Sequence, residues 1–304
     1  KESKPQLRLF TYCKSLNKKA RDNVRMKDGT KRELDIVIPK PLVAIEVNGI
    51  YWHQDKNDLD FDDKHQVKRL FMEKKGGRLL QFTDIDINIR FPIVQSMVRN
   101  ALGLTKNRIG ARQCSVDTLS RQQAAQFLNE NHIQGATPCS YAVGLFYKRT
   151  LVAVMTVGKP RFNKKYDLEL LRFAVRRHCN VSGAFSRCLK AINQQHSGTL
   201  VSYCSLDYGV GAVYQQAGFT LVSEGKPSYR WVNVRGDSYS RYQTQKHRLA
   251  KLLGDKFDPS KSEFMNMSSA GYRKLWDSGS SVWTKTLVPV SAKVIETIQQ
   301  QAAA

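Results

Sequence analysis

The stretches that decide the fold of the first part of the chain are ELDIVIP at residues 33–39 and LVAIEVNGIYWH at residues 42–53. The first run alternates polar and apolar residues, which predicts a β-strand with one buried face. The second begins with a mostly apolar run, which predicts a strand buried on both faces. The Pro-Lys-Pro break at residues 39–41 separates the two runs, so we expect them to form neighbouring arms of one hairpin.

Each of these predicted strands carries a carboxylate, Asp35 on the first and Glu46 on the second. An ionised carboxylate in an apolar strand is costly unless it is paired or metal-bound. The two groups can meet across the strand pair and suit Mg²⁺, with Mn²⁺ as a substitute. Asn48 shares a face with Glu46 and is expected to orient water or phosphate, while His53 is expected to act as acid or base.

A structural alternative exists for each of these residues. Glu46 can be half of a buried salt bridge with Lys68 or Arg69, and His53 can be a hydrogen-bonded loop histidine. Two acidic residues, an amide and a histidine on a strongly basic chain together favour a metal-dependent nuclease centre.

Working outward, the first part of the chain shows further helix and strand patterns. Residues 62–75 have helical periodicity that ends at Gly76-Gly77, and residues 78–83 (RLLQFT) read as a strand. Helices are also expected at residues 6–20 and 93–102, and a hairpin turn at 26–30. This order predicts a mixed α/β sheet.

The charge of the chain indicates a polyanionic partner. The 304 residues carry a net charge of +23, with a pI near 9.9. Up to Leu104 there are 21 Lys and Arg against 14 Asp and Glu, a net +7, which leaves 28 against 12, a net +16, for the rest. Such an excess displaces counterions from nucleic acid, so we expect double-stranded DNA as the partner. The sequence does not indicate the oligomeric state.

The cysteines and hydropathy indicate a protein of the cytoplasm. None of the six cysteines forms a CxxC pair, and reduced thiols account for them. No apolar run of 18 residues occurs, so no membrane partner is expected. The composition changes near residues 102–107, which predicts a linker there.

The motif ELDIVIP…AIEVNGIYWH resembles the very-short-patch-repair-type endonucleases and related phage homing endonucleases of the PD-(D/E)XK superfamily. The resemblance implies that Asp35 and Glu46 bind Mg²⁺ and that His53 is catalytic. Asn48 stands where the superfamily often has lysine, and Gln6 stands where an acidic residue is expected. The resemblance continues through residues 64–68 and 79–82. Lys64, His65 and Lys68 share one helical face, where they can contact phosphate, support the metal site or simply face solvent. Gln81 is also predicted to contact DNA.

The second part of the chain is similar to the GNAT (acetyltransferase-like) fold in three segments: LELLRF at 168–173, VSGA at 181–184 and GAVYQQAGF at 211–219. In that fold a Gly-rich turn at a helix start holds the cofactor pyrophosphate, and here only Gly183-Ala184 remains. Tyr214 is a candidate general acid or a core residue. We expect a degenerate fold retained for DNA binding.

Basic residues of the second part are predicted to contact DNA. The loop at 159–166 mixes basic and aromatic groups, which can neutralise phosphates and stack on bases. The segment 238–253 is expected to be a basic helix, and 271–283 a cap. The predicted contacts are Lys159, Arg161, Lys164, Lys165, Arg172, Arg176, Arg177, Lys246 and Arg248.

The sequence thus predicts three regions: a restriction-endonuclease-like α/β domain at 1–105, a GNAT-like α/β domain at 106–235, and a basic helix with a cap at 236–304. The expected function is a Mg²⁺-dependent, site-specific DNA endonuclease of homing type, encoded by a phage. Two alternatives stay open. One is a GNAT-type acyltransferase acting on nucleic acid, and the other is a DNA-binding protein with a decayed catalytic centre.

Overall fold

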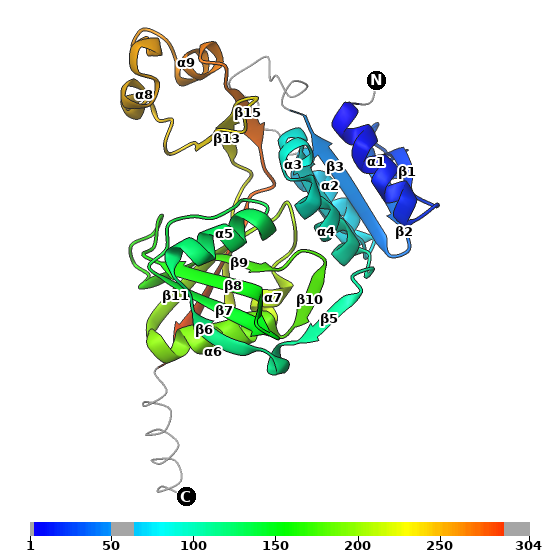
Figure 1. Cartoon of the computed structure of the whole chain (residues 1–304). Coiled ribbons are helices and arrows are strands. Elements are labelled where there is room, and N and C mark those ends of the chain that lie inside the picture. Colours follow the sequence, from blue (N-terminus) through cyan, green and yellow to red (C-terminus); the bar gives the residue numbers. More distant parts are fainter. Residues whose placement is uncertain (1–2, 50–63, 289–304) are drawn as a thin grey trace, which may run out of the picture. The chain divides into compact units, whose positions relative to one another are not determined.

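The computed structural model describes residues 3–49 and 64–288. Contacts divide the chain into two compact units (Figure 1). The first unit contains residues 1–94, 205–209 and 225–280. The second contains residues 95–204, 210–224 and 281–304, so the chain passes between the units several times. Each unit is described below by itself.

The first unit is built on a four-stranded sheet in the order β1-β2-β3-β4. β2 pairs with both β1 and β3 in antiparallel fashion, and β4 runs parallel to β3. The pairing of Ile36 with Ile45 confirms the predicted hairpin. The strands are β1 (Arg21–Arg25), β2 (Glu33–Pro39), β3 (Leu42–Asn48) and β4 (Arg78–Thr83).

Helices connect and flank this sheet. The helices are α1 (Lys4–Leu16), α2 (Lys64–Lys74), α3 (Asp84–Ile89) and α4 (Phe91–Ala101), the last of which crosses the boundary at residue 94. α2 lies between β3 and β4 in the chain, as a parallel pair requires. The sequence did not predict α3, because DIDINI alternates like a strand. Helix α3 begins with a capping box, in which the side chains of Thr83 and Asp86 each accept a hydrogen bond from the other residue's backbone N–H.

A smaller sheet in the order β14-β13-β15 completes the first unit. Its elements are β13 (Tyr229–Val232), β14 (Ser238–Ser240), α8 (Lys246–Leu253), the 3-10 turn η2 (Gly254–Lys256), α9 (Glu263–Ser269) and β15 (Arg273–Trp276). Trp231 is fully buried against Leu249 and Met267. The single helix predicted at 238–253 is therefore wrong. Gln243 accepts hydrogen bonds from Ser240 and forms a turn that interrupts it.

The second unit is built on a seven-stranded sheet in the order β12-β16-β11-β9-β8-β7-β6. β9 and β11 run parallel, whereas β6 to β9 are successively antiparallel. A separate parallel pair joins β5 to β10. The elements are β5 (Asn107–Gly110), η1 (Ala111–Gln113), β6 (Ser115–Thr118), α5 (Arg121–Asn131), β7 (Tyr141–Tyr147), β8 (Thr150–Gly158), β9 (Leu168–Val175), β10 (Cys179–Ser182), α6 (Ala184–Gln195), β11 (Gly198–Ser205), α7 (Ala212–Gln216), β12 (Thr220–Glu224) and β16 (Ser280–Leu287).

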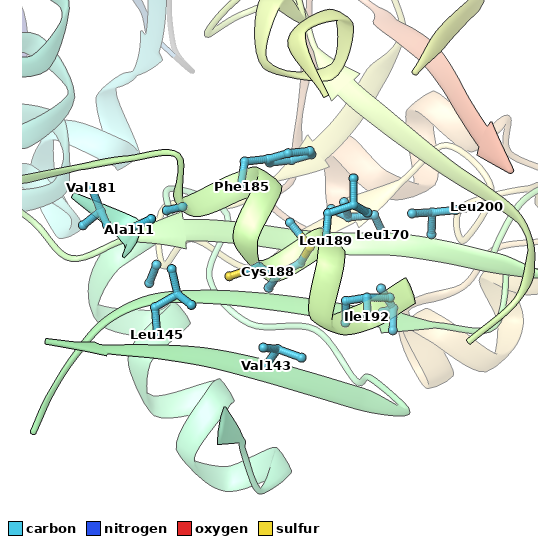
Figure 2. Packing of buried hydrophobic residues seen from close by; sticks show 14 of the residues in the cluster. Ala111, Val143, Leu145, Leu170, Val181, Phe185, Cys188, Leu189, Ile192 and Leu200 are labelled. Atoms are coloured by element: carbon cyan, nitrogen blue, oxygen red, sulfur yellow. The ribbon is translucent and has the colours of Figure 1, made fainter. Parts of the chain in front are cut away.

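Helices α5 and α6 cover opposite faces of this sheet (Figure 1). Phe185, Cys188, Leu189 and Ile192 recur at helical spacing and are buried. Figure 2 shows this stripe packed on side chains of the sheet, among them Leu145 and Leu170 from β7 and β9. The core of the unit therefore lies mainly between α6 and the sheet.

The mixed α/β architecture predicted for both parts is confirmed, whereas the boundaries differ. The first unit ends at 94 in its opening segment, not at 105, and it takes up residues 225–280 from later in the chain. The closing cap expected at 271–283 is wrong. β15 joins the small sheet of the first unit, and β16 inserts between β12 and β11 in the second.

Replacing Ile192 with alanine tests the packing of α6. Ile192 is fully buried, so the cavity and lost burial should lower the free energy of unfolding by roughly 2–5 kcal/mol. Gln194→Ala, on the exposed face of the same helix, is the control and should change it by less than about 0.5 kcal/mol. Equal effects of the two substitutions in chemical denaturation would contradict the packing.

Candidate functional site

The parallel strands β9 and β11 of the second unit stay paired for only three residues. The register joins Leu200 to Leu168, Val201 to Glu169 and Ser202 to Leu170, after which pairing stops. β9 continues to Val175 and β11 to Ser205. The strands therefore part towards their carboxyl ends, which is where α/β sheets commonly bind ligands.

A pair of hydroxyl groups lies on the α6 face where the strands part. The Ser202 hydroxyl donates to the Tyr214 hydroxyl at 3.0 Å, and Ser202 is buried. Burial, reinforced by nearby Cys204, raises the pKa of Tyr214 to about 12. Tyr214 therefore holds its proton at neutral pH and can act as a proton donor.

Aromatic packing fixes the Tyr214 ring. The ring stacks on Trp283 with centroids 5.8 Å apart and meets Phe185 and Phe219 edge-on. Gly211 precedes α7 in the left-handed region at φ 81°, and a Cβ there would lie 2.6 Å from the Trp283 ring. Only glycine permits this close approach, so the turn, Trp283 and Tyr214 form one rigid arrangement.

The amino terminus of α6 provides backbone donors. Gly183 caps this 12-residue helix at φ 79°, and no side chain caps the first turn. The first N–H groups of a helix lack intrahelical partners and favour an anion. Arg176, upstream of the turn, is exposed. This end of α6 is the place at which a pyrophosphate can bind.

The predicted DNA contacts of the second unit differ in exposure and in the protein groups that they already contact. Lys159, Lys164, Lys165 and Arg176 are exposed, and Arg177 is half-buried. Two of the exposed cations also donate to backbone carbonyls, Lys164 to Pro160 at 2.7 Å and Arg176 to Leu151 at 3.3 Å. Arg172 donates to the carbonyls of Gly135 and Leu171. Its guanidinium is thereby given a structural role in place of the predicted phosphate contact.

Arg161 is held by a buried carboxylate. Its Nε and Nη2 donate to Glu169 Oε1 at 2.9 and 2.6 Å, and its backbone N–H donates to Glu169 Oε2 at 2.7 Å. Glu169 is fully buried, so the ion pair satisfies a charge that water cannot reach. Arg161 thus positions the loop that follows β8, and its side chain is engaged by the protein itself.

The two remaining predicted contacts lie in α8 of the first unit. Lys246 is exposed. Arg248 is half-buried, donates to the hydroxyl of Tyr242 at 2.6 Å and lies 3.8 Å from the centre of that ring. Both remain predicted DNA contacts.

The carboxylates of the first unit come together as expected. Asp35 N–H donates to Glu46 Oε1 at 3.2 Å, and Val47 N–H donates to Asp35 Oδ2 at 2.7 Å. Lys68 donates to Glu46 Oε2 at 2.5 Å, which is the salt bridge given above as the structural alternative. Burial and the nearby Asp35 charge raise the pKa of Glu46 to about 7, although Lys68 opposes the shift.

The ammonium of Lys68 supplies the positive charge that Mg²⁺ was expected to supply. In the described part of the chain no cluster of three His, Cys, Asp or Glu residues is arranged to hold a metal. Both oxygens of Glu46 already accept a hydrogen bond. The described donors therefore do not make an evident fit for Mg²⁺ or Mn²⁺, and that site stays a prediction.

Three other predicted residues of the first unit, Asn48, His65 and Gln81, are buried. Asn48 is buried at the end of β3, and His53 lies outside the described residues, as does the side chain of Lys64. His65 Nδ1 and Gln81 Oε1 are 2.8 Å apart, and both residues are at least 95 % buried. Gln81 also donates to the Ser278 hydroxyl. His65 and Gln81 therefore link elements inside the unit, which corrects their expected contact with DNA.

Sequence reasoning missed Ser202, Glu169 and Trp283. Glu169 could have been found, because it is an acidic residue in the apolar run LELL, the same signal that singled out Glu46. Ser202 and Trp283 carry no such signal, since their role depends on contacts with Tyr214 from other segments.

Comparison with protein families gives one match. The model of the Mom protein family matches residues 113–275, which is 163 of the 304 residues. The matched range includes the small sheet of the first unit and most of the second unit. The Mom family is involved in phage DNA modification. No curated protein matches the chain.

Solved structures similar to the chain include several acetyltransferases. An aminoglycoside 6'-acetyltransferase type Ii is 12% identical, with 58% of this chain and 98% of that chain covered, at a TM-score of 0.33. A putative acetyltransferase from Salmonella typhimurium with acetyl-CoA is 10% identical, with 58% and 95% covered, at a TM-score of 0.33. An acetyltransferase from Bacillus subtilis in complex with CoA is 9% identical, with 58% and 99% covered, at a TM-score of 0.33. Overlaps at this TM-score establish neither the fold nor the activity of this chain.

These comparisons overturn the expected identity and activity. The resemblance to very-short-patch-repair and homing endonucleases is wrong as an assignment of the chain, because the matched family is Mom. The predicted Mg²⁺-dependent hydrolysis of phosphodiester bonds is wrong for the same reason. Throughout residues 3–49 and 64–288, no helix combines the length and hydrophobicity needed to cross a bilayer.

The carboxylate of Glu46 predicts a pH dependence of stability. Its raised pKa means that the folded chain binds this proton more tightly than the unfolded chain, so stability is lost as pH rises from about 4.5 to about 7. Glu46→Gln removes this loss. The unfolding free energy of the variant minus that of the wild type should rise by up to about 3 kcal/mol between pH 4.5 and pH 8.

Chemical denaturation at several pH values measures this difference. Glu33→Gln, an exposed residue of the neighbouring strand β2, is the control and should give a difference that is nearly constant with pH. A difference for Glu46→Gln that is equally constant would show that burial does not raise the pKa of Glu46.

Proposed function

The chain belongs to the Mom protein family, and from that premise we propose that it is a DNA-modifying acyltransferase that moves an acyl group from acyl-coenzyme A to an amino group of a nucleobase. The family's part in phage DNA modification supports DNA as the substrate. The net charge of +23 supports binding to a polyanion. The observation that carries the proposal is the parting of β9 and β11 beside Tyr214.

Two features of the second unit would hold the acyl donor. The uncapped first turn of α6 behind Gly183 offers N–H groups and a partial positive charge to a pyrophosphate. Beyond their three shared pairs β9 and β11 do not pair with each other, and an extended chain lying between them would border both strands. Both features lie in one unit, and the GNAT-like segments predicted from the sequence include Gly183 and part of β9 but not β11.

The side chains beside the parted strands can assist transfer. A bound acyl thioester supplies an activated carbonyl carbon, to which the amine nitrogen bonds as the carbon–sulfur bond breaks. Tyr214, with a pKa of about 12, would donate its proton to the departing sulfur, and the proton that the amine loses would pass to solvent, from which Tyr214 would regain its own. Ser202 would orient the Tyr214 hydroxyl. The products are the acylated base and the free thiol.

Exposed cations would bring double-stranded DNA to this unit. Lys159, Lys164, Lys165 and Arg176 are exposed, and each can neutralise a phosphate without reading sequence. The family's association with phages supports an origin in a phage genome and action in the bacterial cytoplasm.

Tyr214→Phe tests the proposed acid. With acetyl-CoA and DNA, mass spectrometry of the digested nucleosides should show acylation that is 10²- to 10⁴-fold slower than with the wild type. Acetyl-CoA affinity measured by calorimetry should stay within about 2-fold, because the ring remains. Tyr147→Phe removes a hydroxyl from β7 of the same sheet and should leave the rate unchanged. Acylated nucleosides formed at equal rates by Tyr214→Phe and the wild type would contradict the role of Tyr214, and absence of both binding and product would contradict the activity.

Gly183→Val tests the proposed pyrophosphate site. Gly183 has φ 79°, which strains any other residue, and a side chain there also alters the start of α6. Acetyl-CoA affinity should fall at least 10-fold by calorimetry. Gly103→Val is the matched control, since Gly103 has φ 69° with nothing within 4 Å of an added Cβ and does not cap α6. Equal affinities of both variants would place the pyrophosphate elsewhere.

A further inference from the structure

The loop between β8 and β9 presents an aromatic ring to solvent. Phe162 is 65% exposed, among the most exposed large hydrophobic side chains in the described part of the chain. Its ring meets the ring of Tyr203 edge-on, with centroids 5.3 Å apart and an interplanar angle of 84°. The Arg161 guanidinium lies 5.4 Å from the centre of the Phe162 ring, and the ring surface left exposed can stack on a ligand.

A buried ion pair fixes the conformation of the loop between β8 and β9. The residue directly before Phe162 is Arg161, whose three hydrogen bonds go to the fully buried Glu169. A buried carboxylate and a guanidinium with matched geometry hold the backbone at this point. Phe162 is therefore positioned before any ligand arrives, so little ordering entropy is lost on binding.

The position of Tyr203 connects this surface to the parted strands. Tyr203 follows Ser202, the last residue of β11 that pairs with β9, and successive strand residues face opposite sides of the sheet. Ser202 contacts Tyr214 on one face, and Tyr203 contacts Phe162 on the other. The aromatic pair thus lies across β11 from the proposed proton donor.

The charge around the aromatic pair suits a nucleic acid. Lys159, Lys164 and Lys165 are exposed on the same loop, and the Lys165 ammonium lies 4.9 Å from the centre of the Tyr166 ring. Surfaces that combine cations with exposed aromatic rings commonly bind single-stranded nucleic acid, because the phosphates contact the cations and the bases stack on the rings.

We propose that Phe162 and Tyr203 form a stacking site for one unpaired nucleobase of DNA, which the loop at 159–166 holds beside the parted ends of β9 and β11. A base within a duplex cannot reach groups in the sheet while it is stacked, so the target base leaves the helix or is single-stranded. The proposal rests on the proposed function for its purpose, because stacking here would present the base amino group to the acyl donor. The stacking itself can be measured without any acyl transfer.

Phe162→Ala and Phe162→Trp test this site in the full chain. The probe is a single-stranded oligonucleotide containing 2-aminopurine, whose fluorescence is quenched when it stacks on an aromatic ring. The wild type should quench it, and Phe162→Ala should weaken binding roughly 5- to 100-fold. The slope of log affinity against log salt should stay the same, since no phosphate contact is lost. Phe162→Trp should restore binding and quenching.

Lys165→Gln is the matched variant for the electrostatic part and should reduce the salt slope by about one unit while quenching persists. Unchanged affinity of Phe162→Ala, or a loss explained wholly by a reduced salt slope, would overturn the stacking site. A duplex with the 2-aminopurine opposite a mismatch should bind more tightly than a fully paired duplex, and equal affinity for the two would overturn base extrusion. Calorimetry with acetyl-CoA separates the two proposals: absence of binding there, with quenching intact, contradicts the acyltransferase and leaves the stacking site standing.

Discussion

The short pairing of β9 with β11 is the constraint on which the candidate site depends. The two parallel strands share only three residue pairs and do not pair with each other beyond them. Their carboxyl ends therefore separate, which is where α/β sheets commonly bind ligands. The hydroxyls of Ser202 and Tyr214, the turn at Gly183 and the loop after β8 all belong to elements that border this place. The separation of the strands therefore places these features around one candidate site.

The two faces of β11 carry different chemistry. On the α6 face, Ser202 and Tyr214 lie among apolar rings that keep the phenol protonated. On the other face, Glu169 fixes Arg161, and Phe162 is exposed among lysines. Acyl transfer to DNA would need a proton donor shielded from water and a charged surface that binds and stacks the polyanionic acceptor. The two faces of β11 would provide these separately. The alternation of side chains along one strand is sufficient to produce this division.

Local patterns predicted most elements of the chain, because their signals lie within a few residues. The strands at 33–39 and 78–83 were predicted at their observed bounds. The hairpin that brings Asp35 to Glu46 was also predicted. The helix expected at 238–253 failed, since a turn at Ser240 interrupts it.

Long-range contacts explain what the sequence did not predict. β16 follows the small sheet in the chain yet pairs with β12, and the passage of residues 205–209 and 225–280 into the first unit has no local signature. The sequence placed the Asp35 and Glu46 carboxylates together but did not settle the positively charged group beside them. Lys68 is that group, and it was recognised from sequence only as an alternative.

Hydrogen exchange with and without acetyl-CoA tests the central claim most directly, since it reports on backbone groups along the whole chain. If the donor lies between the parted strands and on α6, acetyl-CoA should slow exchange at residues 171–175 and 183–187 and leave residues 33–48 unchanged. Exchange that is unaffected in both segments of the second unit, or slowed only in the first unit, would contradict the account.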